Sequence, residues 1–208
     1  MQVTVFGANG KVGQLVVRGL LDRGHSVVAF VHEKNSLPTH SKLGIQKGDI
    51  HSSDDIAKAI ERSEAVVSVL SSWQAPGKDV LSAAMQRLIP AMRAQNISRV
   101  ISLTGAIAFD SKDRVGILDN VQHALLNAVS PKVLRDAEDH LRLLRDSGLK
   151  WTVVRSPLMV KFGSPAYKLQ NVFPAPWATI HYQAVAECII NLVETSEYAQ
   201  QAPVITRA

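Results

Sequence analysis

Residues 1–21 read MQVTVFGANGKVGQLVVRGLL, and this stretch decides the fold. A short apolar run at 2–6 comes first, glycines follow at positions 7, 10 and 13, and a helical pattern comes next. Glycine weakens any strand or helix that it interrupts, so three of them here indicate that the backbone must pass close to something. A second apolar run begins at residue 26 and completes a strand–helix–strand unit.

The alternation of apolar runs and helical patterns continues along most of the chain. Its spacing predicts strands at 2–6, 26–31, 44–47, 65–70, 99–103 and 151–155. It predicts helices at 11–22, 53–62, 77–95 and 131–147. We expect Pro90 to kink or shorten the third helix, and Ser52 or Ser53 to cap the second. The pattern predicts an α/β fold, a Rossmann-like doubly wound parallel sheet with helices on both faces.

The chain is predicted to form one domain over residues 1–208, because no linker, repeat or low-complexity tract interrupts it. The regular alternation breaks at 156–180, where prolines and aromatic residues gather. Irregular segments held by a rigid sheet often carry binding function. We therefore expect 156–180 to be an irregular insertion on the substrate side of a small C-terminal region.

Composition excludes several classes of protein. No apolar run reaches the roughly 18 residues of a membrane span, and the single cysteine, Cys188, fits a reducing compartment, so we expect a cytoplasmic protein with no membrane partner. The net charge of +5 comes from scattered basic residues, which disfavours a nucleic-acid partner. The histidines lack metal-ligand spacing, so no metal site is expected. Composition leaves monomer and homodimer open.

The glycines stand where a dinucleotide-binding loop requires them. Gly7 would permit the tight turn, Gly10 would let the backbone approach a pyrophosphate, and Gly13 would let helix and sheet pack closely. The amino end of the helix would then offer free N–H groups to phosphates. A purely structural turn is the alternative. The loop predicted to bind the cofactor is Gly7, Ala8, Asn9, Gly10, Lys11, Val12 and Gly13.

The spacing G-x-x-G-x-x-G in GANGKVG resembles the atypical, NAD(P)H-binding branch of the short-chain dehydrogenase/reductase superfamily. Further stretches follow in that family's order over nearly the whole chain: VVAFVHEK, KGDIHSSDDIAKAI, AVVSVLSS, RVISLTGA and LRDSGLKWTVVRSP. The stretch DHLRLLRDSGLKW is particularly similar to the biliverdin reductase B and flavin reductase group. This resemblance implies a Rossmann-like fold and, in many members, NADP as cofactor.

The end of the second predicted strand bears on the choice between NADP and NAD. Val31 stands where NAD-binding relatives usually place an acid, and His32 stands where NADP-binding relatives commonly have arginine. With Lys34 nearby, these residues favour the 2′-phosphate of NADP. Glu33 would repel a phosphate if it turned inward, and His32 could instead be a solvent-exposed turn residue, so NAD stays possible.

Other cofactor contacts are expected at the ends of later strands. Asp49 and Ile50 resemble the family's pair beside the adenine, although Asp49 could equally be a turn or capping residue. Strand ends at one sheet edge meet a bound dinucleotide. On that ground the central part of the cofactor is predicted to meet the backbone and hydroxyls of Leu70, Ser71 and Ser72, and the nicotinamide to lie near Leu103 and Thr104.

The usual proton-transfer pair of the superfamily, Y-x-x-x-K, is missing. The residues four positions after Tyr167, Tyr182 and Tyr198 are Asn171, Ala186 and Ala202. Thr104 is the remaining candidate catalytic residue, since its hydroxyl could orient substrate or the nicotinamide amide, although a threonine at a strand end is more often structural. Lys132 is expected to be exposed. The histidine that the flavin reductase group has after its sixth strand is replaced here by Leu158, and His181 is too distant in sequence to stand in for it.

Two functions fit these residues. The first is an NADP-dependent reductase that transfers hydride to a planar flavin-like or quinone-like acceptor, whose own ring system makes a protein proton donor unnecessary. The second is a non-catalytic NAD(P)-binding sensor, as in the nitrogen-metabolite-repressor type of relative, which also lacks the Tyr/Lys pair. Sensor-type relatives tend to carry a larger C-terminal region than this chain has, which slightly favours the reductase.

Overall fold

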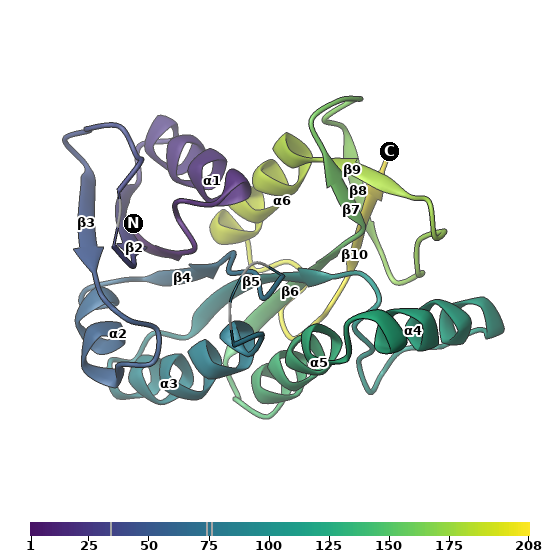
Figure 1. Ribbon diagram of the computed structural model, residues 1–208. Coiled ribbons are helices and arrows are strands. Elements are labelled where there is room, and N and C mark those ends of the chain that lie inside the picture. Colours follow the sequence, from purple (N-terminus) through teal and green to yellow (C-terminus); the bar gives the residue numbers. More distant parts are fainter. Residues whose placement is uncertain (34, 74, 76) are drawn as a thin grey trace.

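A central β-sheet with helices on both faces makes up the computed structural model, which describes residues 1–33, 35–73, 75 and 77–208 (Figure 1). The strands are β1 (Gln2–Phe6), β2 (Ser26–Val31), β3 (Leu43–Lys47), β4 (Ala65–Ser68), β5 (Arg99–Gly105), β6 (Lys150–Ser156), β7 (Leu158–Val160), β8 (Tyr167–Gln170), β9 (Thr179–His181) and β10 (Val204–Arg207). The helices are α1 (Lys11–Asp22), α2 (Ser53–Ala59), α3 (Val80–Ala94), α4 (Ile117–Val129), α5 (Pro131–Arg145) and α6 (Tyr182–Glu194).

The strand order explains where a ligand can bind. Within the described ranges the main sheet runs β3-β2-β1-β4-β5-β6-β10-β8, and β7 pairs with β9 apart from it. Pairing in the main sheet is parallel except between β10 and β8. The winding reverses between β1 and β4, and doubly wound sheets bind ligands beyond the carboxyl ends of the strands at such a point. The predicted Rossmann-like fold is confirmed.

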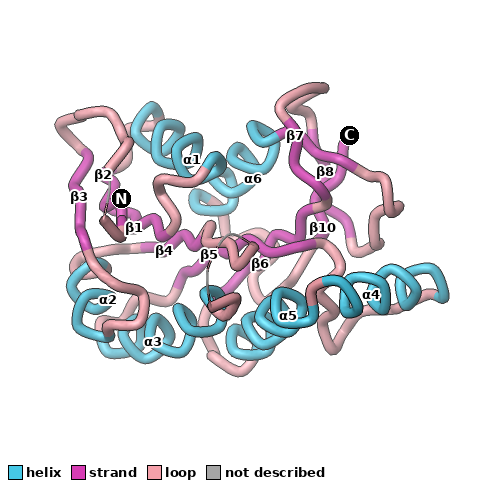
Figure 2. The backbone as a smooth tube through the Cα atoms, viewed as in Figure 1, coloured by secondary structure: helices cyan, strands magenta, loops and turns pink. Residues whose placement is uncertain are grey.

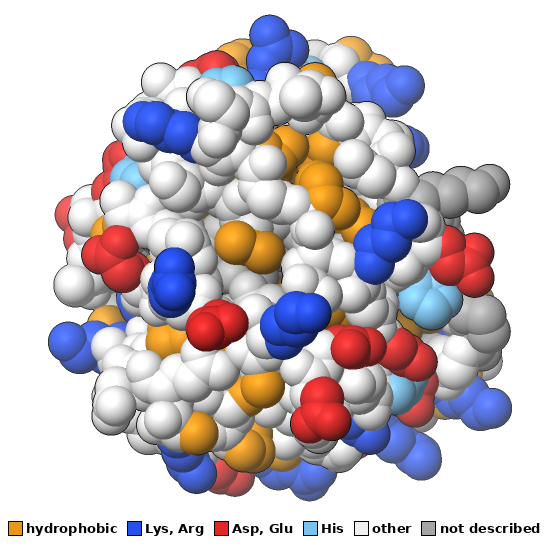
Figure 3. Space-filling model, turned by 90° about the vertical axis from the view of Figure 1, so that its left-hand side faces the viewer, with side chains coloured by type: hydrophobic (Ala, Val, Ile, Leu, Met, Phe, Trp, Pro, Cys, Tyr) orange, Lys and Arg blue, Asp and Glu red, His pale blue; other side chains and the backbone are white. Residues whose placement is uncertain are grey.

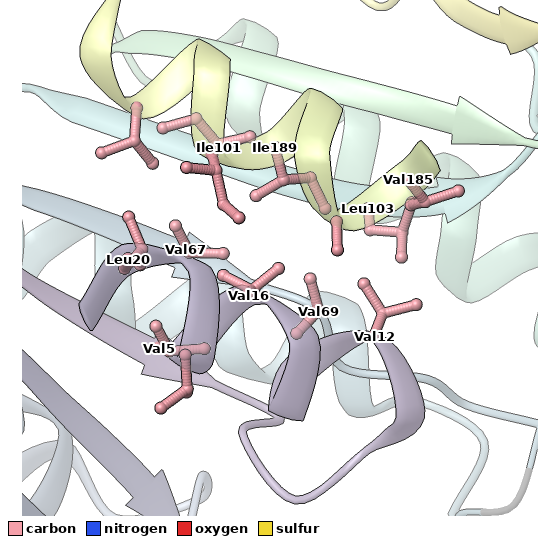
Figure 4. Packing of buried hydrophobic residues seen from close by; sticks show 14 of the residues in the cluster. Val5, Val12, Val16, Leu20, Val67, Val69, Ile101, Leu103, Val185 and Ile189 are labelled. Atoms are coloured by element: carbon pink, nitrogen blue, oxygen red, sulfur yellow. The ribbon is translucent and has the colours of Figure 1, made fainter. Parts of the chain in front are cut away.

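Helices cover the sheet in two layers (Figures 1 and 2). α1 and α6 pack together on one face, whereas α2, α3 and α5 line the other. Residues of one strand alternate between the two layers: Val5 belongs to the cluster under α1 and α6, and Phe6 belongs to the opposite one. Figure 4 shows Val16 of α1 and Ile189 of α6 meeting over the sheet. Because both faces are covered, the central strands are mostly apolar, which is why they could be recognised in the sequence.

The predicted elements of the first half agree closely with the structure. β1, β2 and α1 have the predicted bounds. Ser52 caps α2, its hydroxyl accepting from the amide of Asp55 at 3.2 Å, as expected. Of the two effects expected of Pro90, shortening of α3 at that point is wrong, because the helix continues to Ala94, and a kink stays a prediction. Pro90 lies on the exposed side of α3, where water can hydrogen-bond the carbonyl that the proline leaves free.

The second half contains more regular structure than predicted. The prediction of an irregular segment at 156–180 is corrected by β7 and β8, which lie inside it, and by β9 at its end. α4, α6 and β10 were not predicted at all. α6 fills the face beside α1, and β10 returns to the sheet beside β6. The C-terminal region is therefore an integral part of the sheet and its cover.

The surface shows no gathering of one charge on the face over β3, where acidic and basic side chains are interspersed (Figure 3). Among the described residues, no helix combines the length and the apolarity needed to cross a bilayer. α4 differs from the other helices in having no buried residue, and it leaves Leu118 and Leu125 largely exposed.

Candidate functional site

The glycine loop between β1 and α1 owes its shape to contacts that no side chain could make. Gly7 has a φ of +80°, and a Cβ there would lie 2.7 Å from the carbonyl oxygen of Val69. A Cβ on Gly13 would lie 2.1 Å from the carbonyl oxygen of Gly7. Both glycines are therefore required by the fold, one at the crossing with β4 and one where α1 meets β1.

Gly10 is different, because its backbone angles suit any residue and a Cβ there would be crowded less closely than at Gly7 or Gly13. Its φ of −70° and ψ of 165° suit any residue, and it is the N-cap of α1. A Cβ would meet one neighbour within 4 Å, the Gly7 carbonyl oxygen at 3.2 Å. The bare backbone at Gly10 thus faces open space at the amino end of a helix, where N–H groups and the helix dipole favour an anion. This cradle fits the pyrophosphate of a dinucleotide.

The other loop residues take several roles. Ala8 and Val12 are buried, and their contact with a cofactor stays a prediction. The Asn9 side-chain oxygen accepts from the amide and hydroxyl of Ser36, at 3.1 and 3.0 Å. This contact ties the glycine loop to the segment after β2. The Lys11 ammonium lies 5.4 Å from the centre of the Tyr182 ring at the start of α6.

The residues expected to select the cofactor lie at the end of β2. Val31 is buried, and His32 has 73% of its side chain exposed, 3.8 Å from the carboxylate of Glu33. Lys34 lies outside the described residues. The hydrogen bonds between Asn9 and Ser36 hold the segment after β2 next to the glycine loop, and contact between His32 and a cofactor stays a prediction.

Asp49 and Ile50 follow β3 at the same edge of the sheet. The Asp49 carboxylate accepts from the amide of His51 at 2.9 Å, and its own amide donates to Asp55 at 2.9 Å. This is the turn role that was the alternative for Asp49. Its carboxylate is nevertheless exposed, and Ile50 is half-buried against the core, so contact with an adenine stays a prediction.

The loop after β4 is held by a side chain of α5, which the sequence did not suggest. Ser71 is exposed, but Ser72 is buried and its hydroxyl donates to the carboxylate of Asp136 in α5. The hydroxyl of Ser72, which the sequence suggested as a ligand contact, is thus already engaged inside the protein. Leu70 is half-buried against the core, and the binding roles of all three loop residues stay predictions.

Asp136 also caps α3. It accepts from the amides of Leu81 and Ser82, at 3.0 and 2.8 Å, and from the Ser82 hydroxyl at 2.6 Å. Asp79, the N-cap residue of α3, makes no such side-chain bond. One buried carboxylate from α5 thus fixes both ends of the loop that leads from β4 to α3. Sequence reasoning missed Asp136 because its partners are more than 50 positions away.

His140 lies one turn after Asp136 and is fully buried. Its Nε2 shares a hydrogen bond of 2.8 Å with the Ser102 hydroxyl of β5, and its Nδ1 has no partner among the described residues. Burial lowers the pKa of His140 from 6.5 to about 4, with the charge of Asp136 acting in the opposite sense. The imidazole is therefore neutral at pH 7.

The end of β5 carries a hydroxyl without a partner. Thr104 is only 7% exposed, and its Oγ1 makes no hydrogen bond with the described residues. Buried hydroxyls are normally hydrogen-bonded, so an orphan at a carboxyl strand end indicates a place for a ligand atom or an ordered water. Leu103 beside it is buried in the cluster under α1 and α6.

The far side of this edge is organised by Arg155 of β6. Its buried guanidinium pairs with Asp113 and donates to the carbonyl oxygens of Ala108 and Ala202. It also lies 5.1 Å from the centre of the Phe173 ring. Arg155 thereby joins the segment after β5, the approach to β10 and the segment after β8.

His181 and Lys132 were the alternative proton donors considered from the sequence, and the structure engages the first and exposes the second. The His181 Nδ1 accepts from the amide of Gln183 and its Nε2 reaches the carbonyl oxygen of Lys161, both at 3.0 Å, so the ring ties β7 to α6. Leu158 is 72% exposed at the position of the family histidine. Lys132 is exposed, as expected. Among the described residues, no group of three His, Cys, Asp or Glu is arranged to hold a metal.

A family model described as NAD(P)H-binding matches residues 7–196. The chain belongs to the NAD(P)H-binding family. This membership confirms the expected class of cofactor, and the match begins at the first glycine of the loop. A 3-beta-hydroxysteroid dehydrogenase from Mycolicibacterium neoaurum is 42% identical over 59 residues, which are 28% of this chain and 16% of that protein. This chain thus matches a small part of that longer relative.

Solved structures, short-chain dehydrogenases/reductases among them, share the fold of this chain. One from Veillonella parvula, in complex with NADP, has a TM-score of 0.80 at 16% identity, covering 99% of this chain and 94% of that one. A protein described as an NADH-flavin reductase from Streptococcus pneumoniae has a TM-score of 0.78 at 20% identity and 100% coverage of both chains. An anaerobilin reductase from Escherichia coli O157:H7 has a TM-score of 0.78 at 18% identity, covering 100% and 97%.

Replacing Gly10 with valine is expected to abolish tight NADPH binding in a folded protein. The backbone angles accept valine, whose methyl groups would occupy the space in front of the α1 amides. We expect a loss of affinity of at least about tenfold, measured by titration calorimetry, because the pyrophosphate loses its amide contacts. Gly44→Val on β3, where a Cβ meets little, is the matched control. Unchanged NADPH affinity in folded Gly10→Val would contradict this placement of the cofactor.

His140 is expected to make stability depend on pH. Its folded pKa of about 4 lies below the ordinary 6.5, so the unfolded chain binds the extra proton between these values. The free energy of unfolding should therefore fall as the pH drops through this window, by up to about 1 kcal/mol per pH unit. His140→Gln, which keeps a donor for Ser102 but does not titrate, should flatten that dependence in urea titrations at successive pH values. His51→Gln at an exposed position is the control, and equal slopes in all three proteins would refute the assignment.

Proposed function

We propose that the protein is an NADPH-dependent reductase that transfers hydride to a flat, conjugated acceptor such as a flavin or a quinone. The observation that carries the proposal is the buried, unpartnered Thr104 hydroxyl at the carboxyl end of β5, on the edge of the sheet where the glycine loop lies. The named activities of the structural neighbours, flavin reductase and anaerobilin reductase, agree with such an acceptor.

The chain's own residues would hold the cofactor along the edge of the sheet. The amides at the start of α1 would bind the pyrophosphate around Gly10, and His32 would face the adenosine end. Thr104 would then stand near the nicotinamide, since β5 lies beyond β4 in the sheet order. When bound, NADPH supplies the hydride.

The proposed acceptor follows from what the protein offers around Thr104. Reduction of a simple ketone needs a proton donor in the site, whereas a flavin or quinone spreads the incoming charge over its ring and can take its proton from water. No Y-x-x-x-K pair occurs in the sequence, and His181 is engaged by Gln183 and Lys161. Orientation is therefore the contribution expected of Thr104, with its hydroxyl donating to the acceptor or to the nicotinamide amide.

His32 is expected to give a preference for NADPH over NADH. No acid stands at Val31 to bind a 2′-hydroxyl, and the exposed imidazole can donate to a 2′-phosphate. Comparing dissociation constants of both cofactors, His32→Ala should lower the preference by roughly three- to tenfold. Glu33→Gln should raise it, because a neighbouring negative charge is removed. A His32→Ala selectivity equal to that of the wild type would remove His32 from the site.

Thr104→Val is expected to reduce turnover with menadione or riboflavin by about tenfold, while leaving NADPH affinity nearly unchanged. Valine keeps the shape of threonine and removes only the hydroxyl, whereas Thr104→Ser keeps the hydroxyl and should retain most activity. The measurement is steady-state oxidation of NADPH. Efficient reduction of aliphatic ketones by the wild type would contradict the acceptor class, and tight NADPH binding without turnover of any acceptor would favour the sensor.

A further inference from the structure

The C-terminal strand brings an arginine to the same edge of the sheet. β10 runs parallel to β6, with Val204 opposite Arg155. Arg207 lies three residues beyond Val204, so it stands at about the level of Leu158, just past the carboxyl end of β6. On its other side Arg207 pairs with Tyr167 of the antiparallel strand β8.

Arg207 lines a hollow that adjoins the proposed reaction site. The hollow has a volume of about 340 Å³ and is lined by Pro157, Trp177, Ala178, Thr179, Thr206 and Arg207. Pro157 follows directly on Ser156, which pairs with Gly105, the residue after Thr104. The hollow thus lies on the acceptor side of the site.

The hollow is chemically suited to an anion. The Arg207 guanidinium donates to the Thr179 hydroxyl at 2.7 Å and forms no ion pair with the described residues. The sequence from 147 to 186 contains no aspartate or glutamate. Arg155 by contrast is already paired with Asp113. Arg207 is therefore a cation with unused donors, and a guanidinium binds phosphate or carboxylate through two N–H groups at once.

The other wall of the hollow offers an aromatic surface. Trp177 has 81% of its surface exposed, which is unusual for so large an apolar side chain. An indole beside a guanidinium suits a ligand that combines an apolar part with a negative charge.

We propose that Arg207 and Thr179 form a subsite for the anionic arm, phosphate or carboxylate, of an acceptor whose flat ring lies beside Thr104. This inference rests on the proposed function and narrows its substrate class to anionic acceptors. Arg207 is the residue that sets this specificity, and it takes no part in the hydride transfer.

Flavins that differ only in their arm test the subsite. FMN carries a phosphate, riboflavin is neutral, and a flavin with a carboxymethyl group on ring N10 carries a carboxylate. Arg207→Gln should raise the KM for FMN or for the carboxymethyl flavin by about tenfold, with the KM for riboflavin and every kcat unchanged. Lys168→Gln, which removes a neighbouring cation that does not line the hollow, should change none of these values.

The pattern of responses identifies the anion. A shift with FMN alone assigns a phosphate, a shift with the carboxymethyl flavin alone assigns a carboxylate, and a shift with both assigns either. Arg207→Lys, which keeps the charge but loses the planar fork, should recover part of the affinity. Equal KM values for wild type and Arg207→Gln with both anionic flavins would overturn the proposal.

A failure of the proposed reaction can be distinguished from a failure of the proposed subsite by measuring binding. If no flavin is turned over, the binding of FMN, the carboxymethyl flavin and riboflavin is measured by flavin fluorescence with NADP⁺ present. An affinity for either anionic flavin that falls about tenfold in Arg207→Gln, with riboflavin unaffected, would uphold the subsite without the reaction. Equal affinities of the two proteins for both anionic flavins would overturn the subsite too.

Discussion

The contact between the first turn of α1 and the end of β1 is the constraint on which the site depends. Gly13 lies so close to the Gly7 carbonyl that even a methyl group would collide with it. Because the helix and the strand meet so closely, the free amides at the start of α1 lie at the carboxyl edge of the sheet. Gly7 in turn lies against Val69, at the crossing of β1 with β4 where the winding reverses. The anion-binding end of a helix and the ligand-binding edge of the sheet therefore coincide.

Two buried charges keep the rest of this edge in place. Asp136 holds the loop after β4 and the start of α3, and Arg155 holds the segments that frame the acceptor side. Each is almost fully buried and satisfied by several hydrogen bonds, so replacing either would leave polar partners unpaired in the core. In the proposed site, a buried charge with satisfied hydrogen bonds thus lies behind the cofactor side and another beside the acceptor side, whereas His32 and Arg207 are exposed side chains.

The sequence predicted the first half of the fold well, because strands covered on both faces are short continuous apolar runs and the glycine loop marks the first crossover. The prediction missed α6 although a signal was present, because the polar residues of that helix, Gln183, Glu187, Asn191 and Glu194, recur at helical spacing between buried apolar ones. It missed β10 because four residues at the end of the chain give no periodicity to read. The capping role of Asp136 could not be predicted for another reason. It depends on contacts between α5 and α3 that exist only in the folded chain.

These differences fall on one side of the molecule for a physical reason. A dinucleotide is bound largely by backbone amides at the crossover between a strand and a helix. Glycines in a short stretch of sequence indicate that backbone geometry. The proposed acceptor subsite is lined by residues that follow β6, that precede and begin β9, and that lie on β10, and these stretches are far apart in the sequence. The proposed cofactor-binding half of the site can therefore be predicted from residues 7–13. The proposed acceptor half can be recognised only when β10 is placed beside β6 and brings Arg207 to the edge of the sheet at which Thr104 lies.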